Sequence, residues 1–414
     1  MVRENIPLDR DDGYERQGRR EWRKGLKILA VVSTLDLKLR LACTPAWWQL
    51  FKALHETGNE VIVIPYLGRP IDSLWWRTYD NPCYEESVMF NSFLEWRRRR
   101  GVSPSKKSSF FPLFDLIIKH YIRPKWKKHL LNVLRGEKGV ECLLFMNVPL
   151  NHMTGIPSVI KQRMEIPVVY YDGDMPTILP KYSVERGFKF NYYEDADLSE
   201  YDVFLTNSKG CIPDLEAMGA KNVHPLFYGI DPDLCAPINI EKDIDISFFG
   251  YGSDFREEWM QKLITIPSEK MRKVNFVVAG GNFRIDLGNA KIIGDLSYSE
   301  WRQFCCRSKI NLNITRWSHT NIYASSTSRP FELAAFGASI VSQPYNGIEE
   351  WFEVGKELMV VNDENEAVKM YRYLLDNEEE RERTGIRARE RVLKEHTFKH
   401  RACQLINIIR DIKG

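Results

Sequence analysis

The residue types best suited to chemistry stand in the run from Ser328 to Glu332, Ser-Arg-Pro-Phe-Glu. A proline in the first turn fixes a helix start. The free N–H groups of a helix N-terminus, its macrodipole and the adjacent Arg329 together suit a diphosphate. One turn further in, the Glu332 carboxylate can accept both hydroxyls of a ribose, as acidic residues do in dinucleotide sites. The alternative is a plain first-turn glutamate favoured by the dipole, with Ser328 as the helix cap.

A second group of candidate residues is Gly250-Tyr251-Gly252, which follows a predicted strand. Glycine lets backbone N–H groups approach anionic oxygens because it carries no side chain. Arg256, on the helix expected next, can neutralise charge on a departing nucleotide, or is simply a solvated helix charge. The motif lacks the third glycine of the dinucleotide fingerprint, and no acid ends the next strand, 274–279. Both absences argue against an NAD enzyme.

Two carboxylates in the N-terminal half, Asp172 and Asp174, come directly after a predicted strand. A carboxylate at the mouth of a cleft can act as the general base for an acceptor hydroxyl, which an inverting enzyme needs. The alternative is that Asp172 caps a turn and Asp174 is solvated. His152 is a second candidate base, although a lone histidine in a loop is more often merely exposed.

The elements that must position these residues follow an alternating pattern. Apolar runs of strand length alternate with helical segments, which favours parallel, doubly wound sheets. The ligand of such a sheet binds at the carboxyl ends of its strands, so we expect the site in a cleft between two α/β halves. The predicted strands are 26–32, 60–64, 140–146, 167–171, 203–206, 222–226, 245–249, 274–279, 292–293, 310–314, 339–342 and 358–361.

Breaks in this pattern divide the chain into four parts. A charged extension, 1–24, precedes an N-terminal Rossmann-like domain, 25–236, which we assign to the acceptor. A proline-rich linker then leads into a second Rossmann-like domain, 237–397, which we assign to the donor. The last part, 398–414, is a C-terminal helix.

The composition bounds the class of protein. With 414 residues, 43% hydrophobic and 28% charged, the chain fits two soluble globular domains. Its eight cysteines form no CxxC pair and no metal-ligand spacing, which is typical of a reducing compartment. No signal peptide and no apolar run of about 18 residues is visible. We therefore expect a cytoplasmic protein.

One segment of the chain has a large excess of basic residues. Residues 93–138 carry 13 Lys or Arg against three acids, with large apolar residues interleaved. Basic residues beside apolar ones attach proteins reversibly to anionic lipid, here the inner face of a membrane. The alternatives are a solvated loop and helix with a basic face, or nucleic-acid binding, which we do not expect because no binding motif accompanies the patch.

The stretch from Ser328 to Ser342, SRPFELAAFGASIVS, resembles the donor-site motif of GT-B glycosyltransferases. Within them it most resembles the spore-maturation-like branch of the large retaining group that includes glycogen synthase. The resemblance covers about residues 200–412, through Asn346-Gly347 and His396-Thr-Phe398, and covers the first 200 poorly. It implies two Rossmann-like domains facing each other across a cleft, with the C-terminal helix crossing back to the first.

The resemblance also implies roles. It places Glu332 at the donor ribose, Ser328 and Arg329 at the phosphates, and Gly250-Tyr251-Gly252 across from the leaving diphosphate. Three further positions are expected near the base, phosphate or sugar: Gly294, Asn313 and Arg316. The sequence departs from the group at Ala324, where a second glutamate usually contacts the donor sugar.

The function expected is transfer of a sugar from a nucleoside-diphosphate-sugar, UDP- or GDP-linked, to an acceptor hydroxyl. A hexosyltransferase of this kind needs no bound metal and no other cofactor, and a lipid-linked or cell-envelope glycan is the expected acceptor if the basic segment binds membrane. Two alternatives stay open. One is a nucleotide-sugar 2-epimerase of the same fold, and the other is a non-catalytic scaffold that binds a nucleotide-sugar, which Ala324 favours.

Overall fold

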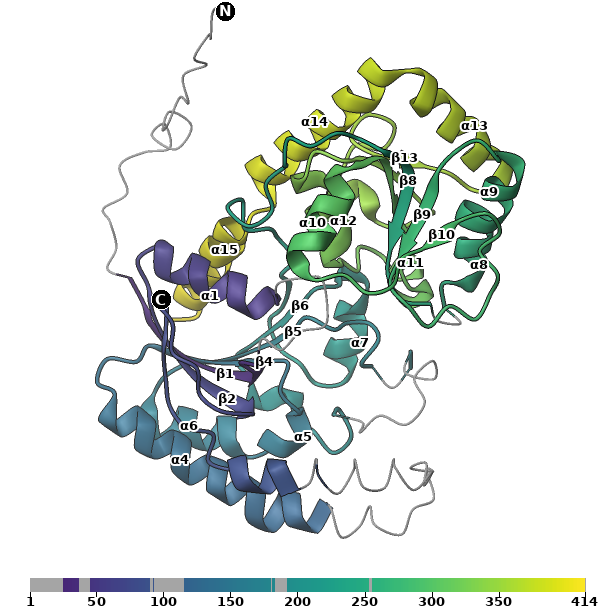
Figure 1. Cartoon of the computed structure of the whole chain (residues 1–414). Coiled ribbons are helices and arrows are strands. Elements are labelled where there is room, and N and C mark those ends of the chain that lie inside the picture. Colours follow the sequence, from purple (N-terminus) through teal and green to yellow (C-terminus); the bar gives the residue numbers. More distant parts are fainter. Residues whose placement is uncertain are drawn as a thin grey trace, which may run out of the picture.

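The computed structural model describes residues 25–36, 45–89, 92, 115–179, 181–182, 192–252 and 255–413. They form two α/β domains side by side, each built on one parallel sheet with helices on both faces (Figure 1). Among these residues, no helix has both the length and the apolar character needed to cross a bilayer. The predicted fold class is confirmed.

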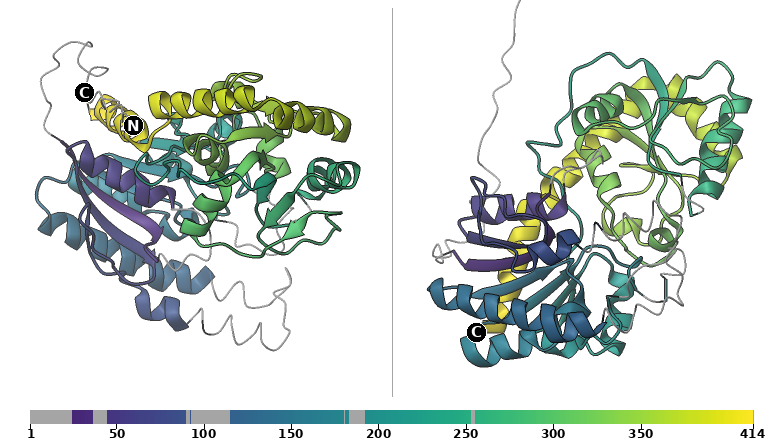
Figure 2. Two further views of the ribbon diagram at one scale, coloured as in Figure 1. Left: turned by 45° about the horizontal axis from the view of Figure 1, so that its top comes forward. Right: turned by 60° about the horizontal axis from the view of Figure 1, so that its bottom comes forward.

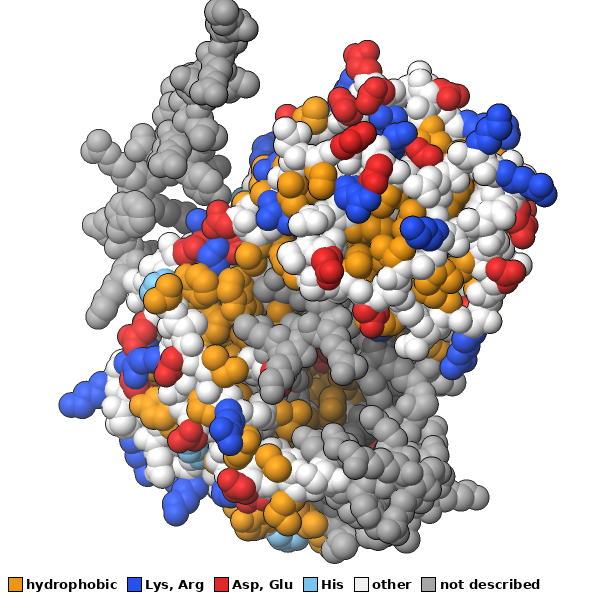
Figure 3. Space-filling view, viewed as in Figure 1, with side chains coloured by type: hydrophobic (Ala, Val, Ile, Leu, Met, Phe, Trp, Pro, Cys, Tyr) orange, Lys and Arg blue, Asp and Glu red, His pale blue; other side chains and the backbone are white. Residues whose placement is uncertain are grey.

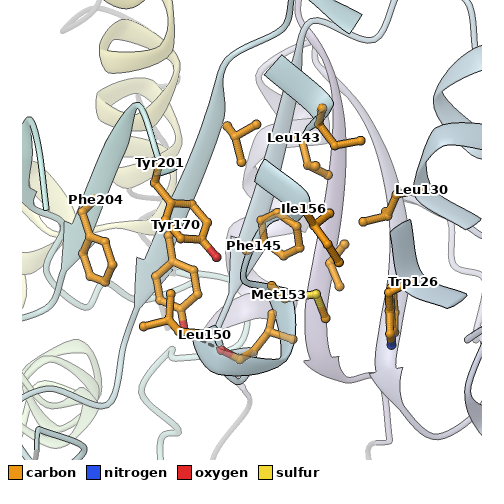
Figure 4. Close-up of a cluster of buried hydrophobic side chains, with 14 of the residues drawn as sticks. Trp126, Leu130, Leu143, Phe145, Leu150, Met153, Ile156, Tyr170, Tyr201 and Phe204 are labelled. Carbon is orange, nitrogen blue, oxygen red and sulfur yellow. Dashed lines mark hydrogen bonds between the residues drawn. The ribbon is translucent and has the colours of Figure 1, made fainter. Parts of the chain in front are cut away.

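The N-terminal domain contains a seven-stranded sheet in the order β3-β2-β1-β4-β5-β6-β7. Its strands are near-continuous apolar runs because helices cover both faces. Figure 4 shows one of these faces, on which Phe145 and Ile156 lie between Tyr170 on one side and Trp126 and Leu130 on the other. The strands are β1 Lys27–Thr34, β2 Glu60–Leu67, β3 Arg77–Thr78, β4 Cys142–Met146, β5 Val168–Asp172, β6 Val203–Thr206 and β7 Val223–Pro225.

The C-terminal domain repeats this architecture with a six-stranded sheet in the order β10-β9-β8-β11-β12-β13. Neighbouring strands of this sheet pair in parallel, so the carboxyl ends of the strands meet at one edge. The strands are β8 Ile244–Phe249, β9 Phe276–Ala279, β10 Lys291–Ile292, β11 Ser308–Asn313, β12 Ser339–Ser342 and β13 Met359–Val360.

The helices connect these strands and cover both sheets. In the N-terminal domain they are α1 Ala46–Glu56, η1 Ile118–Ile122, α4 Arg123–Gly136, α5 Leu150–Met153, α6 Ile156–Met164 and α7 Ile212–Ala217. In the C-terminal domain they are α8 Glu257–Met260, η5 Gln261–Thr265, α9 Ile266–Lys270, α10 Tyr298–Cys306, α11 Trp317–Asn321, α12 Ser328–Ala335, α13 Glu364–Asp376 and α14 Glu378–Glu395. The last helix is α15 Phe398–Lys413.

The twelve predicted strands are all present, with ends shifted by a few residues. Several short elements were not predicted, among them β3, α5, α9 and α11. Each of these four has two to five residues, too few to show a period in the sequence. The basic segment is only partly described, because 93–114 lies outside the described residues. Its later part is the amphipathic helix α4, whose buried face includes Trp126, Leu130 and Leu134.

The C-terminal helix α15 crosses back to the N-terminal domain, as predicted (Figures 1 and 2). Its apolar side chains Ala402, Leu405 and Ile409 are fully buried in the cluster that α1 and β1 form. The Arg401 guanidinium anchors its first turn by donating from Nε to the Phe227 carbonyl at 3.0 Å. The C-terminal helix therefore joins the two domains a second time.

Helix α14 packs so closely on the end of α12 that only glycine fits at position 385. A Cβ atom there would lie 2.2 Å from the Gly337 carbonyl oxygen, whereas one at Gly136, near the end of α4, meets nothing within 4 Å. Gly385→Ala should therefore lower the free energy of unfolding by about 1–3 kcal/mol, the usual cost of overpacking. Denaturant unfolding checks this against Gly136→Ala, which should leave stability unchanged or raise it by up to about 1 kcal/mol. Equal effects of the two substitutions would contradict the packing argument.

Candidate functional site

Helix α12 begins at the carboxyl edge of the C-terminal sheet and carries the central residues of the candidate site. Thr327 occupies its N-cap, and no side chain caps it by a hydrogen bond. Ser328 is the first helical residue, so the alternative in which Ser328 is the cap is wrong. The first N–H groups of the helix are therefore left for another acceptor, which is the usual setting of an anion site.

Three arginines converge in front of this helix. Arg329 lies over the rings of Phe249 and Trp301, with its guanidinium carbon 4.7 Å from each centroid. Arg256, just before α8, donates from one terminal nitrogen to the Tyr251 carbonyl at 2.8 Å. Burial, together with the positive charges of Arg316 and Arg329, lowers the pKa of Arg256 to about 9.

Parts of the Arg256 and Arg329 guanidinium groups lack hydrogen-bond partners among the described residues. The Nε of Arg256 and one terminal nitrogen of Arg329 are buried without a hydrogen bond. Buried donors without acceptors are costly, and like charges that face one another raise the cost further. A bound anion would relieve both effects, because its oxygens accept hydrogen bonds and its charge offsets the repulsion.

The Glu332 carboxylate lies inside α12 and is 2% exposed. One of its oxygens, Oε2, is buried without a hydrogen-bond partner. Burial raises the pKa of this carboxyl, and the neighbouring Arg329 opposes the rise. An acceptor oxygen of this kind, placed beside an arginine cluster, can receive hydroxyl donors of a ligand.

The glycines predicted to face a phosphate have a second explanation. A Cβ at Gly252 would lie 2.4 Å from the Asn282 carbonyl oxygen, and one at Gly280 would lie 1.9 Å from that of Gly250. The loops after β8 and β9 thus pack backbone against backbone. Gly294 has a φ of +74° and accepts a hydrogen bond at 2.6 Å from the Gly280 N–H. Backbone packing therefore accounts for Gly252 and Gly280, and the left-handed φ accounts for Gly294, where a Cβ would meet no atom within 4 Å.

Asn313 is the last residue of β11, and Arg316 follows this strand. Asn313 is fully buried and donates from Nδ2 to the Ser342 hydroxyl at 2.9 Å, whereas its Oδ1 has no partner. Arg316 is the N-cap residue of α11. Ala324, at the position of the missing glutamate, is fully buried with a φ of +45°. Its N–H donates to the Asn346 carbonyl at 2.9 Å.

On the acceptor side, Asp172 is the last residue of β5 and is 1% exposed. Its Oδ2 accepts from the Tyr193 hydroxyl at 2.6 Å, and its Oδ1 accepts from the Asp174 N–H at 2.9 Å. Burial and the Asp174 charge raise the pKa of Asp172 to about 7. Asp174 itself is exposed. Asp172 therefore caps the turn that presents Asp174 to solvent.

His152 is buried rather than exposed, contrary to expectation. Its Nδ1 is hydrogen-bonded to the Tyr66 hydroxyl. Burial and the nearby Arg123 lower the pKa of His152 to about 4. The ring is thus neutral at physiological pH and forms part of the packing between α5 and β2.

The turn that carries Asp172 and the entry to α12 are joined by residues that our site prediction omitted. The Asn207 amide donates to the Met175 carbonyl at 3.0 Å and to the Ser326 carbonyl at 2.9 Å. The Tyr228 hydroxyl donates to the Gly173 carbonyl at 2.9 Å. The only sequence signal was the resemblance of 206–210 and 228–232 to an interdomain approach. These hydrogen bonds link the turn of Asp172 and Asp174 with the entry to α12 across the domain boundary.

Comparisons with known proteins agree with this geometry. Residues 256–407 match a protein-family model described as glycosyl transferase-like. Sucrose-phosphate synthase from Thermosynechococcus elongatus is similar in structure over 93% of this chain and 99% of its own, with a TM-score of 0.60 at 13% identity. HepE from Anabaena in complex with UDP matches over 93% and 100%, with a TM-score of 0.59 at 11% identity.

A third similar structure is α,α-trehalose 6-phosphate synthase from Burkholderia multivorans, which covers 94% of this chain and 98% of its own, with a TM-score of 0.55 at 12% identity. No curated protein sequence matches the chain. At these identities the structures establish the fold and nothing finer. The chain therefore has the GT-B fold, and its segment 256–407 matches the glycosyl transferase-like family.

Proposed function

We propose that this chain is a glycosyltransferase that takes a sugar from a nucleoside-diphosphate-sugar and transfers it to an acceptor hydroxyl. The observation that carries the proposal is the convergence of Arg256, Arg316 and Arg329 in front of α12. Among the described residues, the buried Nε of Arg256 and one terminal nitrogen of Arg329 have no hydrogen-bond partner. A diphosphate supplies several anionic oxygens at this spacing. Glu332, on the same helix, supplies the acceptor for a ribose diol.

The similar structures support the donor class. HepE from Anabaena is described in complex with UDP and with UDP-glucose. We infer a UDP- or GDP-linked hexose for this chain, on the spore-maturation-like branch that the sequence resembles. Catalysis without a bound metal fits this site, because arginine side chains and a helix N-terminus are available to stabilise the leaving charge.

The transfer breaks the bond between the sugar C1 and the diphosphate oxygen and forms one between C1 and the acceptor oxygen. The three arginines offset the charge that grows on the diphosphate as it leaves. We assign the acceptor contact to Asp174, because its carboxylate is exposed at the end of β5. Asp172 is a positioning residue, since both its oxygens already accept hydrogen bonds within the turn.

A scaffold that binds a nucleotide-sugar without turnover is the second candidate. Ala324 favours it, because this buried methyl stands where the resemblance expects a carboxylate at the donor sugar. The two functions share the donor site and differ in turnover. Release of free nucleoside diphosphate in the presence of cell-envelope acceptors therefore separates them.

The donor site predicts that Glu332→Gln weakens nucleotide binding by about 10- to 100-fold, because one charge-assisted acceptor of roughly 1.5–3 kcal/mol is lost. Calorimetric titration of UDP, GDP and their sugars against wild type and variant measures this. Glu379→Gln, an exposed glutamate on α14, is the matched control and should bind like wild type. No binding of any nucleotide to the wild type would refute both the transferase and the scaffold.

The acceptor assignment predicts that Asp174→Asn lowers turnover by about 100-fold or more, the usual contribution of a general base. Its affinity for the donor nucleotide should not change, because Asp174 lies in the other domain. Steady-state kinetics measures the turnover of the variant, and calorimetric titration measures its affinity for the donor nucleotide. Unchanged turnover would remove Asp174 from the reaction and leave the proton to be taken by the leaving phosphate.

The buried Asp172 predicts a pH-dependent stability. Its pKa is about 7 in the folded chain against an ordinary 3.8, so between these values only the folded state holds the proton. The contribution of this carboxyl to the free energy of unfolding therefore falls as pH rises from about 4 to about 7. Asp172→Asn should make the free energy of unfolding depend less on pH. The variant should gain stability relative to wild type at pH 8 and should not gain it at pH 4. Denaturant unfolding at the two pH values tests this, and an identical slope for both proteins would contradict it.

A further inference from the structure

Two neighbouring helical segments of the N-terminal domain carry large apolar side chains that are exposed among the residues that the structure describes. One segment is 84–89 and the other runs from 115 through η1 into α4. The Glu86–Lys125 ion pair joins them, and the Lys125 ammonium lies 5.5 Å from the centroid of the Tyr121 ring. The exposed side chains and their exposed fractions are Val88 42%, Met89 72%, Leu116 52%, Ile117 44% and Tyr121 52%. We call these five residues the apolar face.

The apolar face is held rigidly from its inner side. Trp126 is fully buried and stacks on the Tyr66 ring with centroids 5.6 Å apart. The Arg123 guanidinium donates from Nε to the Asn151 carbonyl at 2.9 Å. Ile118 is also buried, between exposed neighbours. Since the helices are already packed on the sheet through their inner side chains, the fold does not require the outward apolar side chains. Clustered exposed apolar residues of this kind mark a contact with another body.

The charge around the apolar face is positive on balance. Residues 84–89 and 115–136 together contain six Lys or Arg and three acids, Glu85, Glu86 and Asp115. Lys119, Lys127 and Lys128 are exposed beside the apolar side chains. Tyr121 adds a ring with a polar tip, a side chain suited to the boundary between apolar and aqueous phases. Apolar anchors within a basic surround match the surface of an anionic bilayer.

The apolar face lies at the same edge of the N-terminal sheet as the turn of Asp172 and Asp174. Because α4 leads into the start of β4, its first turn lies at the opposite, carboxyl end of the strands. The contact of Arg123 with α5, which follows β4, agrees with this placement. In the view of Figure 3, hydrophobic side chains are visible at the bottom of the N-terminal domain. The turn of Asp172 and Asp174 follows β5 at the same edge of the sheet.

We propose that the apolar face and its surrounding lysines dock this domain on the anionic surface of a lipid bilayer. The bound bilayer lies beside the edge of the sheet that carries the acceptor turn. Docking requires no donor and no turnover, so it stands independently of the proposed transfer. The occupant is lipid rather than a second copy, because a copy of this face would bring one cluster of lysines against another.

The test is sedimentation of the full chain with vesicles of phosphatidylcholine alone and with about one-third phosphatidylglycerol. We expect binding to the anionic vesicles only, and release at about 0.5 M salt, where charges are strongly screened. Two variants should each weaken binding about 10-fold or more: Met89→Ser/Ile117→Ser, which removes apolar anchors, and Lys127→Glu/Lys128→Glu, which reverses charge. All four side chains are exposed, so both variants should keep the wild-type melting temperature.

Matched controls lie on other surfaces. Leu74→Ser removes a side chain from a residue that is 87% exposed, and Lys394→Glu reverses a charge on α14. Both should bind vesicles like wild type. Absence of binding to anionic vesicles, or equal losses in variants and controls, would overturn the proposal. So would a concentration-dependent dimer in light scattering that Met89→Ser/Ile117→Ser abolishes, because the face would then be a self-interface.

Discussion

The amide of Asn207 is the contact on which the arrangement of the site depends. It is fully buried and divides its two hydrogens between the acceptor turn, at Met175, and the entry to the donor helix, at Ser326. The Ser326 N–H and hydroxyl both return hydrogen bonds to the Asn207 carbonyl. A buried amide that loses one partner costs about 1–3 kcal/mol. The two halves of the site are therefore fixed to one side chain and cannot shift independently without that cost.

A second set of hydrogen bonds between the two domains lies close to those of Asn207. The Ile230 N–H donates to the His396 carbonyl at 3.0 Å, and the Phe398 N–H donates to the Ile230 carbonyl at 2.9 Å. Arg401 donates to the Phe227 carbonyl beside them. Both connections between the domains are thus backbone hydrogen bonds fixed by buried side chains. This explains why α15 packs on the first domain although it follows the second in the sequence.

The two sides of the boundary differ in charge. The side of α12 gathers Arg256, Arg316 and Arg329, and Arg329 acts on the buried carboxylate of Glu332. The other side carries Asp172 and Asp174, and burial raises the pKa of Asp172 to about 7. In the proposed transfer, the first side stabilises the anionic leaving group and the second accepts the hydroxyl proton. The same physical cause, removal of charge from water, shifts the pKa of Arg256 down and that of Asp172 up.

The sequence by itself determined the parallel α/β architecture, because fully buried strands read as apolar runs whose length and spacing are local properties. It also determined the donor helix, since Pro330 sets its start and Glu332 follows at a fixed helical distance. The tertiary structure alone decided that Asp172 is buried beneath Tyr193, that His152 is packed against Tyr66, and that Asn207 bridges two turns more than one hundred residues apart. Those outcomes depend on contacts between distant segments. The burial and the ionisation of a side chain are set by its neighbours in space and not by its own residue type alone.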